Sequence, residues 1–314
     1  MMAKYVFGID VGGTTVKCGL FDIEGNVLEK WEIVTRTENN GDHIIPDVAQ
    51  TIQQKIAEKN LQAVDIAGVG IGVPGPVNEK GEVPVAVNLH WGYKNVAEEL
   101  RSELGLPVYV GNDANVAALG EMWMGGGRGT KNLIMVTLGT GVGGGIIING
   151  KILTGAHGAG GEIGHANVEP GYTKAACNCG NKGCLEQFAS ATGIVTLAKE
   201  ELAKAEMDTC LKADHISAKT VFDAYKAKDA VAEKIVARFA GYLGNALSIF
   251  AAVVDPEVFV IGGGVSKAGE ILIDAIEEVY RRDAFKDCKD TPIVLAELGN
   301  DAGIYGAAKL ALQE

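Results

Sequence analysis

The sequence lacks any long block of basic residues, and its overall charge is negative. Its 314 residues include 28 Lys and Arg against 40 Asp and Glu, for a formal net charge of −12. Proteins that bind DNA by neutralising phosphates need clustered positive charge instead. We therefore expect no nucleic acid partner.

The sequence also lacks the marks of export and of membrane insertion. Its N-terminus enters the apolar run 5–9 at once, without the basic segment, apolar stretch and cleavage site of a secretory leader. No uninterrupted apolar run reaches the about 20 residues that a membrane span requires. With 47% hydrophobic residues the chain can bury a large core in one or two domains. We expect a cytoplasmic globular protein without membrane contact.

Cysteine is scarce, and its distribution disfavours a disulfide framework. Three of the six cysteines, Cys177, Cys179 and Cys184, fall within eight residues, and the others are scattered. Together with His165 they make a Cys₃His set, which gives tetrahedral Zn²⁺ four protein ligands and leaves no position for a reacting water. The sequence predicts a structural zinc site. Cys-x-Cys spacing is tighter than usual, so reduced core thiols or an occasional disulfide remain alternatives.

Glycine, by contrast, is abundant, and its 43 residues gather at the ends of apolar β-branched runs. Such clusters mark junctions between strands and turns. The same order of strand, glycine turn and strand occurs twice, more than a hundred residues apart. The expected strands are 5–10, 16–22 and 27–35 in the first copy, and 133–138, 143–148 and 151–154 in the second. The repetition predicts two related lobes.

The rest of the chain reads as alternating helices and strands, which indicates an α/β fold. Further strands are expected at 66–73, 108–110, 258–261 and 293–297. Helices are expected at 46–60, 96–104, 190–205, 218–226, 230–254, 268–280 and 304–312. We predict an N-terminal α/β lobe at 1–114, joined by the C-terminal helix 302–314, and a larger lobe at 115–301 that carries the zinc loop 165–184. No Pro/Gly/Ser-rich linker separates the lobes, so we expect a hinged cleft between them.

These motifs together resemble a known family. The loops Asp10-Val11-Gly12-Gly13-Thr14 and Leu138-Gly139-Thr140-Gly141 resemble the phosphate loops of the sugar kinase, heat-shock protein and actin superfamily. The segments 162–165 and 177–186 resemble the ROK family of repressors, open reading frames and kinases, and within it the bacterial glucose kinases. The resemblance implies a two-lobed, actin-like ATPase (ribonuclease H-like) fold with duplicated βββαβα units. It also implies ATP-dependent phosphorylation of glucose at the C6 hydroxyl.

Repressors of this family carry an N-terminal helix-turn-helix ahead of the first phosphate loop. Only nine residues precede Asp10 in this sequence. A DNA-binding role is therefore not expected.

The glycine loops also have a physical rationale as ATP ligands. Glycines let backbone N–H groups point at phosphate oxygens, Thr14 and Thr140 add hydroxyl donors, and Lys17 adds a cation. Either loop alone could be an ordinary hairpin turn, but the two copies and the triple glycine 262–264 favour nucleotide binding. By resemblance the triple glycine lies near adenosine, and Asp10 holds Mg²⁺ through water. The predicted ATP residues are Asp10, Gly12, Gly13, Thr14, Lys17, Gly139, Thr140, Gly141, Gly262, Gly263 and Gly264.

Asp113 is the predicted catalytic base. Phosphoryl transfer to an alcohol needs one group that orients the hydroxyl and accepts its proton, and Asp113 follows a predicted strand end, where α/β folds place their chemistry. The alternative is an Asx turn or an N-cap for the helix that begins near Ala114. By resemblance, Asn112 binds neighbouring sugar hydroxyls.

The remaining sugar ligands follow from the resemblance. It implies that Glu162, His165 and Glu186 hold sugar hydroxyls, with zinc fixing the loop that carries them. Gly75 and Asn88 also fall where the family contacts sugar. The alternatives for these two residues are an ordinary turn residue and a loop asparagine.

Two other functions stay open. The chain could phosphorylate another substrate of the family, such as N-acetylglucosamine, N-acetylmannosamine or fructose, or it could be a sugar sensor without catalysis. Polyphosphate as donor is disfavoured, because the sequence offers no basic groove. By resemblance we expect a homodimer or homotetramer.

Overall fold

The computed structural model describes residues 3–313, which divide into two compact units. Unit 1 holds the chain up to residue 131 together with residues 145–161 and the segment from 297 onward. Unit 2 holds residues 132–144 and 162–296. The two five-stranded sheets have the same strand order, so the expected α/β fold with a duplicated unit is confirmed.

The first sheet is built from β1 to β4 and β7, in the order β3-β2-β1-β4-β7. β1 pairs antiparallel with β2, and β2 with β3, whereas β1, β4 and β7 run parallel. The carboxyl ends of the three parallel strands therefore lie at the same edge of the sheet. The strands are β1 (Tyr5–Val11), β2 (Thr15–Asp22), β3 (Val27–Val34), β4 (Ile66–Val73) and β7 (Val108–Asn112).

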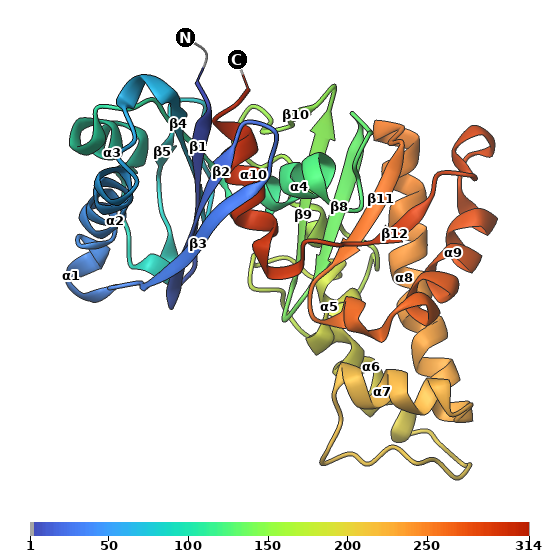
Figure 1. Ribbon diagram of the computed structural model, residues 1–314. Helices are drawn as coiled ribbons and strands as arrows, with labels where there is room; N and C mark the ends of the chain where they lie inside the picture. Colours follow the sequence, from blue (N-terminus) through green and yellow to red (C-terminus); the bar gives the residue numbers. More distant parts are fainter. Residues whose placement is uncertain (1–2, 314) are drawn as a thin grey trace. The chain divides into compact units, whose positions relative to one another are not determined.

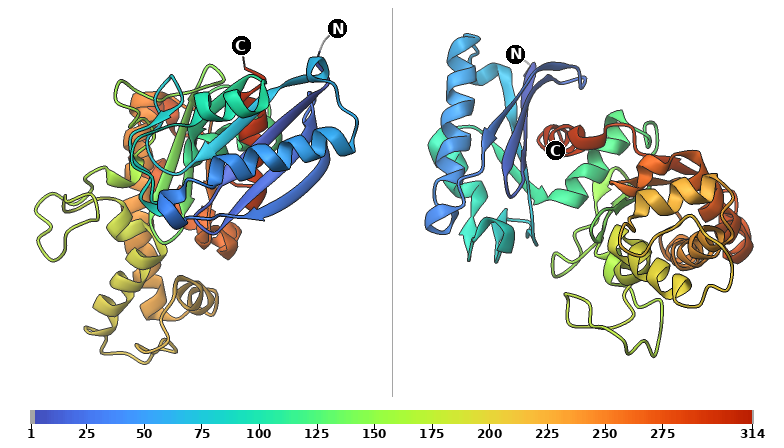
Figure 2. Two further views of the ribbon diagram at one scale, coloured as in Figure 1. Left: turned by 90° about the vertical axis from the view of Figure 1, so that its left-hand side faces the viewer. Right: turned by 90° about the horizontal axis from the view of Figure 1, so that it is seen from below.

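Helices cover both faces of this sheet. α2 (Ile44–Glu58) and α3 (Val96–Leu104) lie on one face, and α10 (Ala302–Leu310) lies on the other (Figure 1; Figure 2, right). α10 approaches β1 and β4 so closely that a side chain at Gly8 or Gly70 would overlap its main chain. α4 (Asp113–Met124) packs against α10.

Shorter elements complete unit 1. The strands β5 and β6 form a two-stranded ribbon, and the helical turns connect the larger elements. These elements are α1 (Glu38–Gly41), β5 (Glu82–Val83), β6 (Lys94–Asn95), β10 (Lys151–Ile152), η1 (Ala63–Asp65), η2 (Val87–Leu89) and η6 (Gly299–Asp301).

The second sheet has the order β10-β9-β8-β11-β12, with β8, β11 and β12 parallel. Its further strands are β8 (Leu133–Leu138), β9 (Val142–Ile148), β11 (Val258–Gly262) and β12 (Ile293–Leu295). The helices of unit 2 are α5 (Glu186–Ala189), α6 (Ala191–Leu202), α7 (Ala218–Lys226), α8 (Ala230–Val254) and α9 (Glu270–Asp283), with the 3₁₀ turns η3 (Ile163–His165), η4 (Val265–Ala268) and η5 (Lys286–Cys288). The helix expected at 268–280 begins two residues later, because Gly269 adopts a φ of +83° that interrupts helical geometry.

α8 is long and apolar enough to cross a membrane by length and composition, although its sequence contains no uninterrupted apolar run of that length. Charged residues in the first turns of α8 interrupt its apolar run, but they do not lower the mean hydropathy of the rest of the helix. Over the most apolar window 56% of the helix is buried, and α8 packs against α6, α7 and α9. That burial is the behaviour of a core helix.

Candidate active site

Asp113 begins α4 at the carboxyl edge of the first sheet. The preceding residue, Asn112, is the N-cap: its Oδ1 accepts the main-chain N–H groups of Ala114 and Asn115, each at 3.1 Å. Asp113 Oδ1 accepts the N–H of Ala114 at 2.8 Å. Since Asn112 is the residue that caps the helix, the N-cap role considered for Asp113 belongs to its neighbour.

The side chain of Asn112 also fixes its surroundings. Its Nδ2 donates to the carbonyl of Gly75 and to Asp113 Oδ1, each at 3.0 Å. The structure thus brings three predicted sugar ligands, Gly75, Asn112 and Asp113, into one hydrogen-bonded group. Gly75 has a φ of +98°, which explains glycine at this turn.

Asp10 lies near Asp113, and the two carboxylates influence each other. Burial, and secondarily the charge of Asp113, raise the pKa of Asp10 from 3.8 to about 6, although Lys17 lowers it. Neighbouring carboxylates in a poorly hydrated place favour a bound cation. These oxygen donors fit Mg²⁺.

The first of the two predicted phosphate loops is a tight turn in unit 1. The N–H of Gly12 donates to Thr15 O at 3.1 Å, and Thr35 Oγ1 donates to Gly12 O at 2.7 Å. Lys17 Nζ donates to the carbonyl of Asn300 at 2.9 Å, so the lysine is held by the turn that leads into α10. Asn88, predicted as a sugar ligand, lies beside Gly13: a Cβ at Gly13 would sit 3.5 Å from Asn88 O.

Glu121, which the sequence did not identify as a site residue, holds the chain segment next to this loop. The carboxylate of Glu121 is fully buried and accepts the main-chain N–H groups of Gly126 (2.9 Å), Glu297 (3.1 Å) and Leu298 (2.9 Å). It thereby fixes the segment that carries Asn300. No sequence signal could have identified it, because glutamate in a helix is normally exposed.

In unit 2, the four predicted zinc ligands come together. The ligand atoms of His165, Cys177, Cys179 and Cys184 all lie within 4.8 Å of one another. His165 Nδ1 lies 3.6 Å from Cys177 Sγ, and the sulfurs of Cys179 and Cys184 are 3.6 Å apart. Three thiols and one imidazole at this separation fit tetrahedral Zn²⁺.

The carboxylates predicted to bind sugar surround this cluster. His165 Nε2, the ring nitrogen turned away from Cys177, lies 3.8 Å from Glu162 Oε2. Glu186 accepts the N–H of Val142 at 3.1 Å through Oε2, and its Oε1 lies 3.7 Å from Cys177 Sγ. A metal bound at Nδ1 would leave Nε2 of His165 and both carboxylates available to hydroxyls.

The second glycine loop lies at the N-terminus of α6. Gly139 O accepts the N–H of Ala191 at 2.8 Å, Thr140 O accepts Thr192 Oγ1 at 3.0 Å, and Ser190 caps the helix. Helix N-termini favour anions, so the local geometry suits phosphate. The triple glycine adjoins the same region, because a Cβ at Gly263 would sit 2.5 Å from Leu138 O.

A small apolar cavity of about 190 Å³ begins at the triple glycine. It is lined by Gly264, Val265 and Ala268 on one side and by Phe222 of α7 on another. Charged residues also line it, namely Lys219, Asp223, Lys226 and Lys267. A cavity that combines apolar and charged groups beside the triple glycine suits a nucleotide base.

Comparisons with known proteins show the family to which the chain belongs. The sequence matches the ROK family over residues 6–314. It is 42% identical to the glucokinase of Halalkalibacterium halodurans, an alignment covering 100% of this chain and 97% of that one. The ROK glucokinase of Streptomyces griseus, solved with glucose and AMPPNP, is 34% identical with a TM-score of 0.74, covering 99% of this chain and 100% of that one. The ROK hexokinase of Thermus thermophilus is 32% identical with a TM-score of 0.82, covering 98% of each chain.

Proposed function

Since this chain belongs to the ROK family, we propose that it phosphorylates glucose with ATP at the C6 hydroxyl, using Asp113 as the general base. ATP-dependent phosphorylation of glucose is the activity of its glucokinase relatives, which match the chain over its full length. The observation that carries the role of Asp113 is its placement: Asn112 ties it to the Gly75 loop at the start of α4.

The proposed reaction needs little covalent chemistry from the protein. Asp113 orients the C6 hydroxyl and accepts its proton as the oxygen attacks the γ-phosphorus in line. Asn112 and Gly75 position the sugar, with Asn88 as a further contact. Glu162, His165 and Glu186 are proposed as further ligands of sugar hydroxyls.

The nucleotide is proposed to bind through the glycine loops. Backbone N–H groups of 12–14 and 139–141 face phosphate oxygens, Thr14 and Thr140 add hydroxyls, and Lys17 adds charge. The triple glycine 262–264 borders the base. Mg²⁺ held near Asp10 would neutralise charge on the β- and γ-phosphates.

Zinc is proposed to be structural. The four ligands come from one histidine and three cysteines, and such closed sites leave no position for substrate. Its role is to hold the loop that carries Glu162, His165 and Glu186. Reduced, metal-ligating cysteines suit the cytoplasm, which we propose as the compartment.

We also propose a homodimer or homotetramer. Ile249 and Val253 of α8 are exposed apolar side chains, which supports burial in an interface.

The test is ADP release by the purified protein with ATP-Mg²⁺ and a panel of glucose, N-acetylglucosamine, N-acetylmannosamine, mannose and fructose. We expect glucose to give the highest kcat/KM. A different preferred sugar would keep the kinase and overturn the substrate. No ADP release with any sugar would overturn the kinase and leave a sugar sensor.

A further inference from the structure

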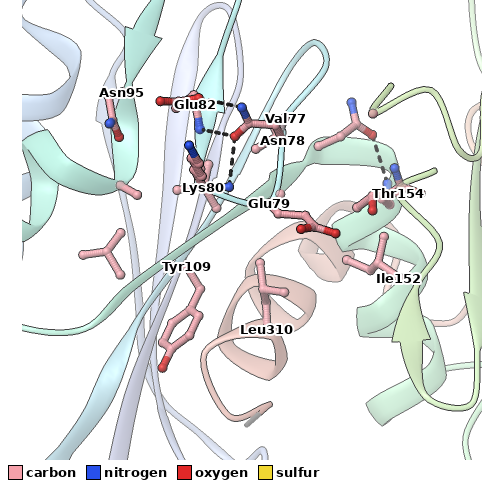
Figure 3. Close-up of a pocket in the computed structure, with 18 of the residues that line it drawn as sticks. Val77, Asn78, Glu79, Lys80, Glu82, Asn95, Tyr109, Ile152, Thr154 and Leu310 are labelled. Carbon is pink, nitrogen blue, oxygen red and sulfur yellow. Dashed lines mark hydrogen bonds between the residues drawn. The ribbon is translucent and has the colours of Figure 1, made fainter. Parts of the chain in front are cut away.

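A cavity of about 660 Å³ lies along the free edge of β7 (Figure 3). Figure 3 shows two of its lining residues bonded to each other, with Asn78 Nδ2 donating to Glu82 Oε2 at 2.6 Å. Asn95 Oδ1 accepts the N–H of Glu98 at 3.1 Å. Because these polar groups have partners within the protein, they do not select a ligand. The hydrogen bonds of a glutamine in unit 2 have a clearer consequence.

The side chain of Gln187 is bonded to the main chain of the loop that carries the cysteine cluster. Gln187 is the second residue of α5 and is half-buried. Its Oε1 accepts the N–H of Gly183 at 2.8 Å and the N–H of Cys184 at 3.1 Å. Its Nε2 donates to Ala175 O at 3.2 Å. One side chain thus joins the segment before Cys177 to the segment that ends at Cys184.

The segment that carries His165 is held at the same place. Gly183 O accepts the N–H of Val168 at 2.8 Å. Gly183 has a φ of +79°, and a Cβ there would sit 2.4 Å from Glu169 O, so the close approach of these segments requires glycine. Gly183 is therefore bonded to Gln187 through its N–H and to the His165 segment through its carbonyl. All three segments that supply metal ligands meet at this side chain or at its immediate partner.

The hydrogen-bonding pattern requires an amide at position 187. Two N–H donors face Oε1 and a carbonyl faces Nε2, so this orientation of the amide pairs every donor with an acceptor. The N–H of Gln187 also donates to Cys184 O at 3.0 Å, so both polar main-chain groups of Cys184 are bonded to Gln187. Glutamate would place a second oxygen against Ala175 O. Methionine would remove all three side-chain bonds.

The segment before Cys177 depends on such contacts because it is poorly buried. Residues 173–176 are all exposed, so packing contributes little to their placement. Lys174 pairs with Glu200 at 2.5 Å, but Lys174 is a long, exposed side chain. Exposed ion pairs contribute little to stability. The half-buried Gln187 is better suited to fix this segment.

We propose that Gln187 is a positioning residue of the metal-binding loop, whose three side-chain hydrogen bonds hold the cysteine ligands at the separation that Zn²⁺ requires. Hydrogen bonds that orient the ligands of a metal strengthen its binding. Gln187 thereby also holds the loop that carries Glu162, His165 and Glu186. This effect on sugar binding rests on the proposed function, whereas the effect on zinc does not depend on kinase activity.

The first test measures zinc binding. Gln187→Met keeps the length of the side chain and removes its three hydrogen bonds. The dissociation constant for zinc, measured on the complete protein by competition with a chromogenic chelator, should rise about 10–100-fold. Lys174→Met, which removes the ion pair of the same segment, should change it by less than about twofold. Gln54→Met, at an exposed position of α2, should bind zinc like the wild type.

The second test separates positioning from a general role in folding. At limiting zinc, the KM for glucose should rise at least about tenfold in Gln187→Met, while kcat at saturating glucose changes by less than about twofold. Excess zinc should return the KM to the wild-type value, because it refills the weakened site. A packing defect would not respond to zinc.

Gln187→Glu serves if methionine at this position prevents folding. It keeps the two N–H contacts and alters the contact with Ala175, so the dissociation constant for zinc should again rise. The role is overturned if the folded variant binds zinc as tightly as the wild type, if Lys174→Met weakens zinc equally, or if excess zinc leaves the KM high. A wild-type protein that binds no zinc would also overturn it. Failure of the wild type to release ADP with any sugar would instead overturn the kinase, and the zinc affinities would still decide the role of Gln187.

Discussion

The buried carboxylate of Glu121 accepts the main-chain N–H of Leu298 at 2.9 Å, although the two residues are 177 positions apart. The same carboxylate accepts the N–H of Glu297. Two residues after Leu298, the carbonyl oxygen of Asn300 accepts a hydrogen bond from Lys17 Nζ. Gly303 packs against the carboxylate of Asp10. Glu121 therefore positions the turn that borders the first phosphate loop.

We expect Glu121→Gln to weaken both stability and nucleotide use. The amide would direct donors at main-chain N–H groups, so the free energy of unfolding should fall by about 1–3 kcal/mol. Because the displaced turn holds Lys17, the KM for ATP-Mg²⁺ should rise more than the KM for glucose. Urea denaturation and steady-state kinetics check this, with the exposed Glu103→Gln as control. A Gln variant with wild-type stability and wild-type KM for ATP would refute this role.

The raised pKa of Asp10 predicts that the stability of the folded protein depends on pH. Since the pKa is raised from 3.8 to about 6, the folded state holds the proton more tightly than the unfolded chain. The contribution of Asp10 to the free energy of unfolding is fully present below about pH 4 and is lost as the pH rises through about 6. The difference between these two limits is about 3 kcal/mol.

Asp10→Asn should therefore stabilise the ligand-free protein at about pH 8, by up to about 3 kcal/mol, while abolishing turnover. The gain should shrink towards zero near pH 4. Thermal unfolding without nucleotide or divalent cation, measured across this range, checks the prediction. A gain of equal size at both ends of the range would contradict it.

The Cys₃His cluster and the glycine turns could be predicted from the sequence because both are local patterns. Cys177, Cys179 and Cys184 lie close along the chain, and the loop 12–14 follows its strand directly. The α/β order followed from periodicity, and the family resemblance is confirmed by the match over residues 6–314. The boundary of α9 was missed by two residues because a single glycine conformation decides it.

The groups that the sequence could not reveal act across long separations. No sequence pattern near Glu121 indicates that its carboxylate accepts three main-chain N–H groups, two of which belong to Glu297 and Leu298. Asn115 reads as an ordinary helix residue, and only the structure shows that its Nδ2 donates to Gly160 O at 3.2 Å. Such contacts depend on tertiary packing, which composition and periodicity do not encode.

Removal of the proposed zinc should loosen the loop that we propose to bind sugar. Cys179→Ser deletes one of four ligands, so we expect metal content to fall, the melting temperature to drop and the KM for glucose to rise at least about tenfold, in line with the loss from disturbed metal sites. The KM for ATP should change less. Elemental analysis, thermal unfolding and kinetics measure the three effects.

The control for this variant is Cys210→Ser, since Cys210 is an exposed thiol outside the cluster. Wild-type protein purified without any bound metal, yet with full activity and stability, would show that the cluster is not a zinc site.

The triple glycine offers a matched pair of substitutions. Gly263 has a φ of +87° and no room for a Cβ against Leu138, whereas Gly264 has ordinary helical angles and open space. Gly263→Ala should cost at least about 1–3 kcal/mol of unfolding free energy from backbone strain alone. Gly264→Ala should change stability by less than about 1 kcal/mol. Equal effects of the two substitutions would argue against this account of the loop.

The central claim, that Asp113 is the base of a glucose kinase, is tested most directly by Asp113→Asn. The amide keeps the shape of the side chain and the N–H contact of Ala114 but cannot take a proton. We predict that kcat falls about 10²–10⁴-fold, while the dissociation constant for glucose, measured by calorimetry, changes by less than about tenfold. An Asp113→Asn protein that turns over glucose at the wild-type rate would contradict the account.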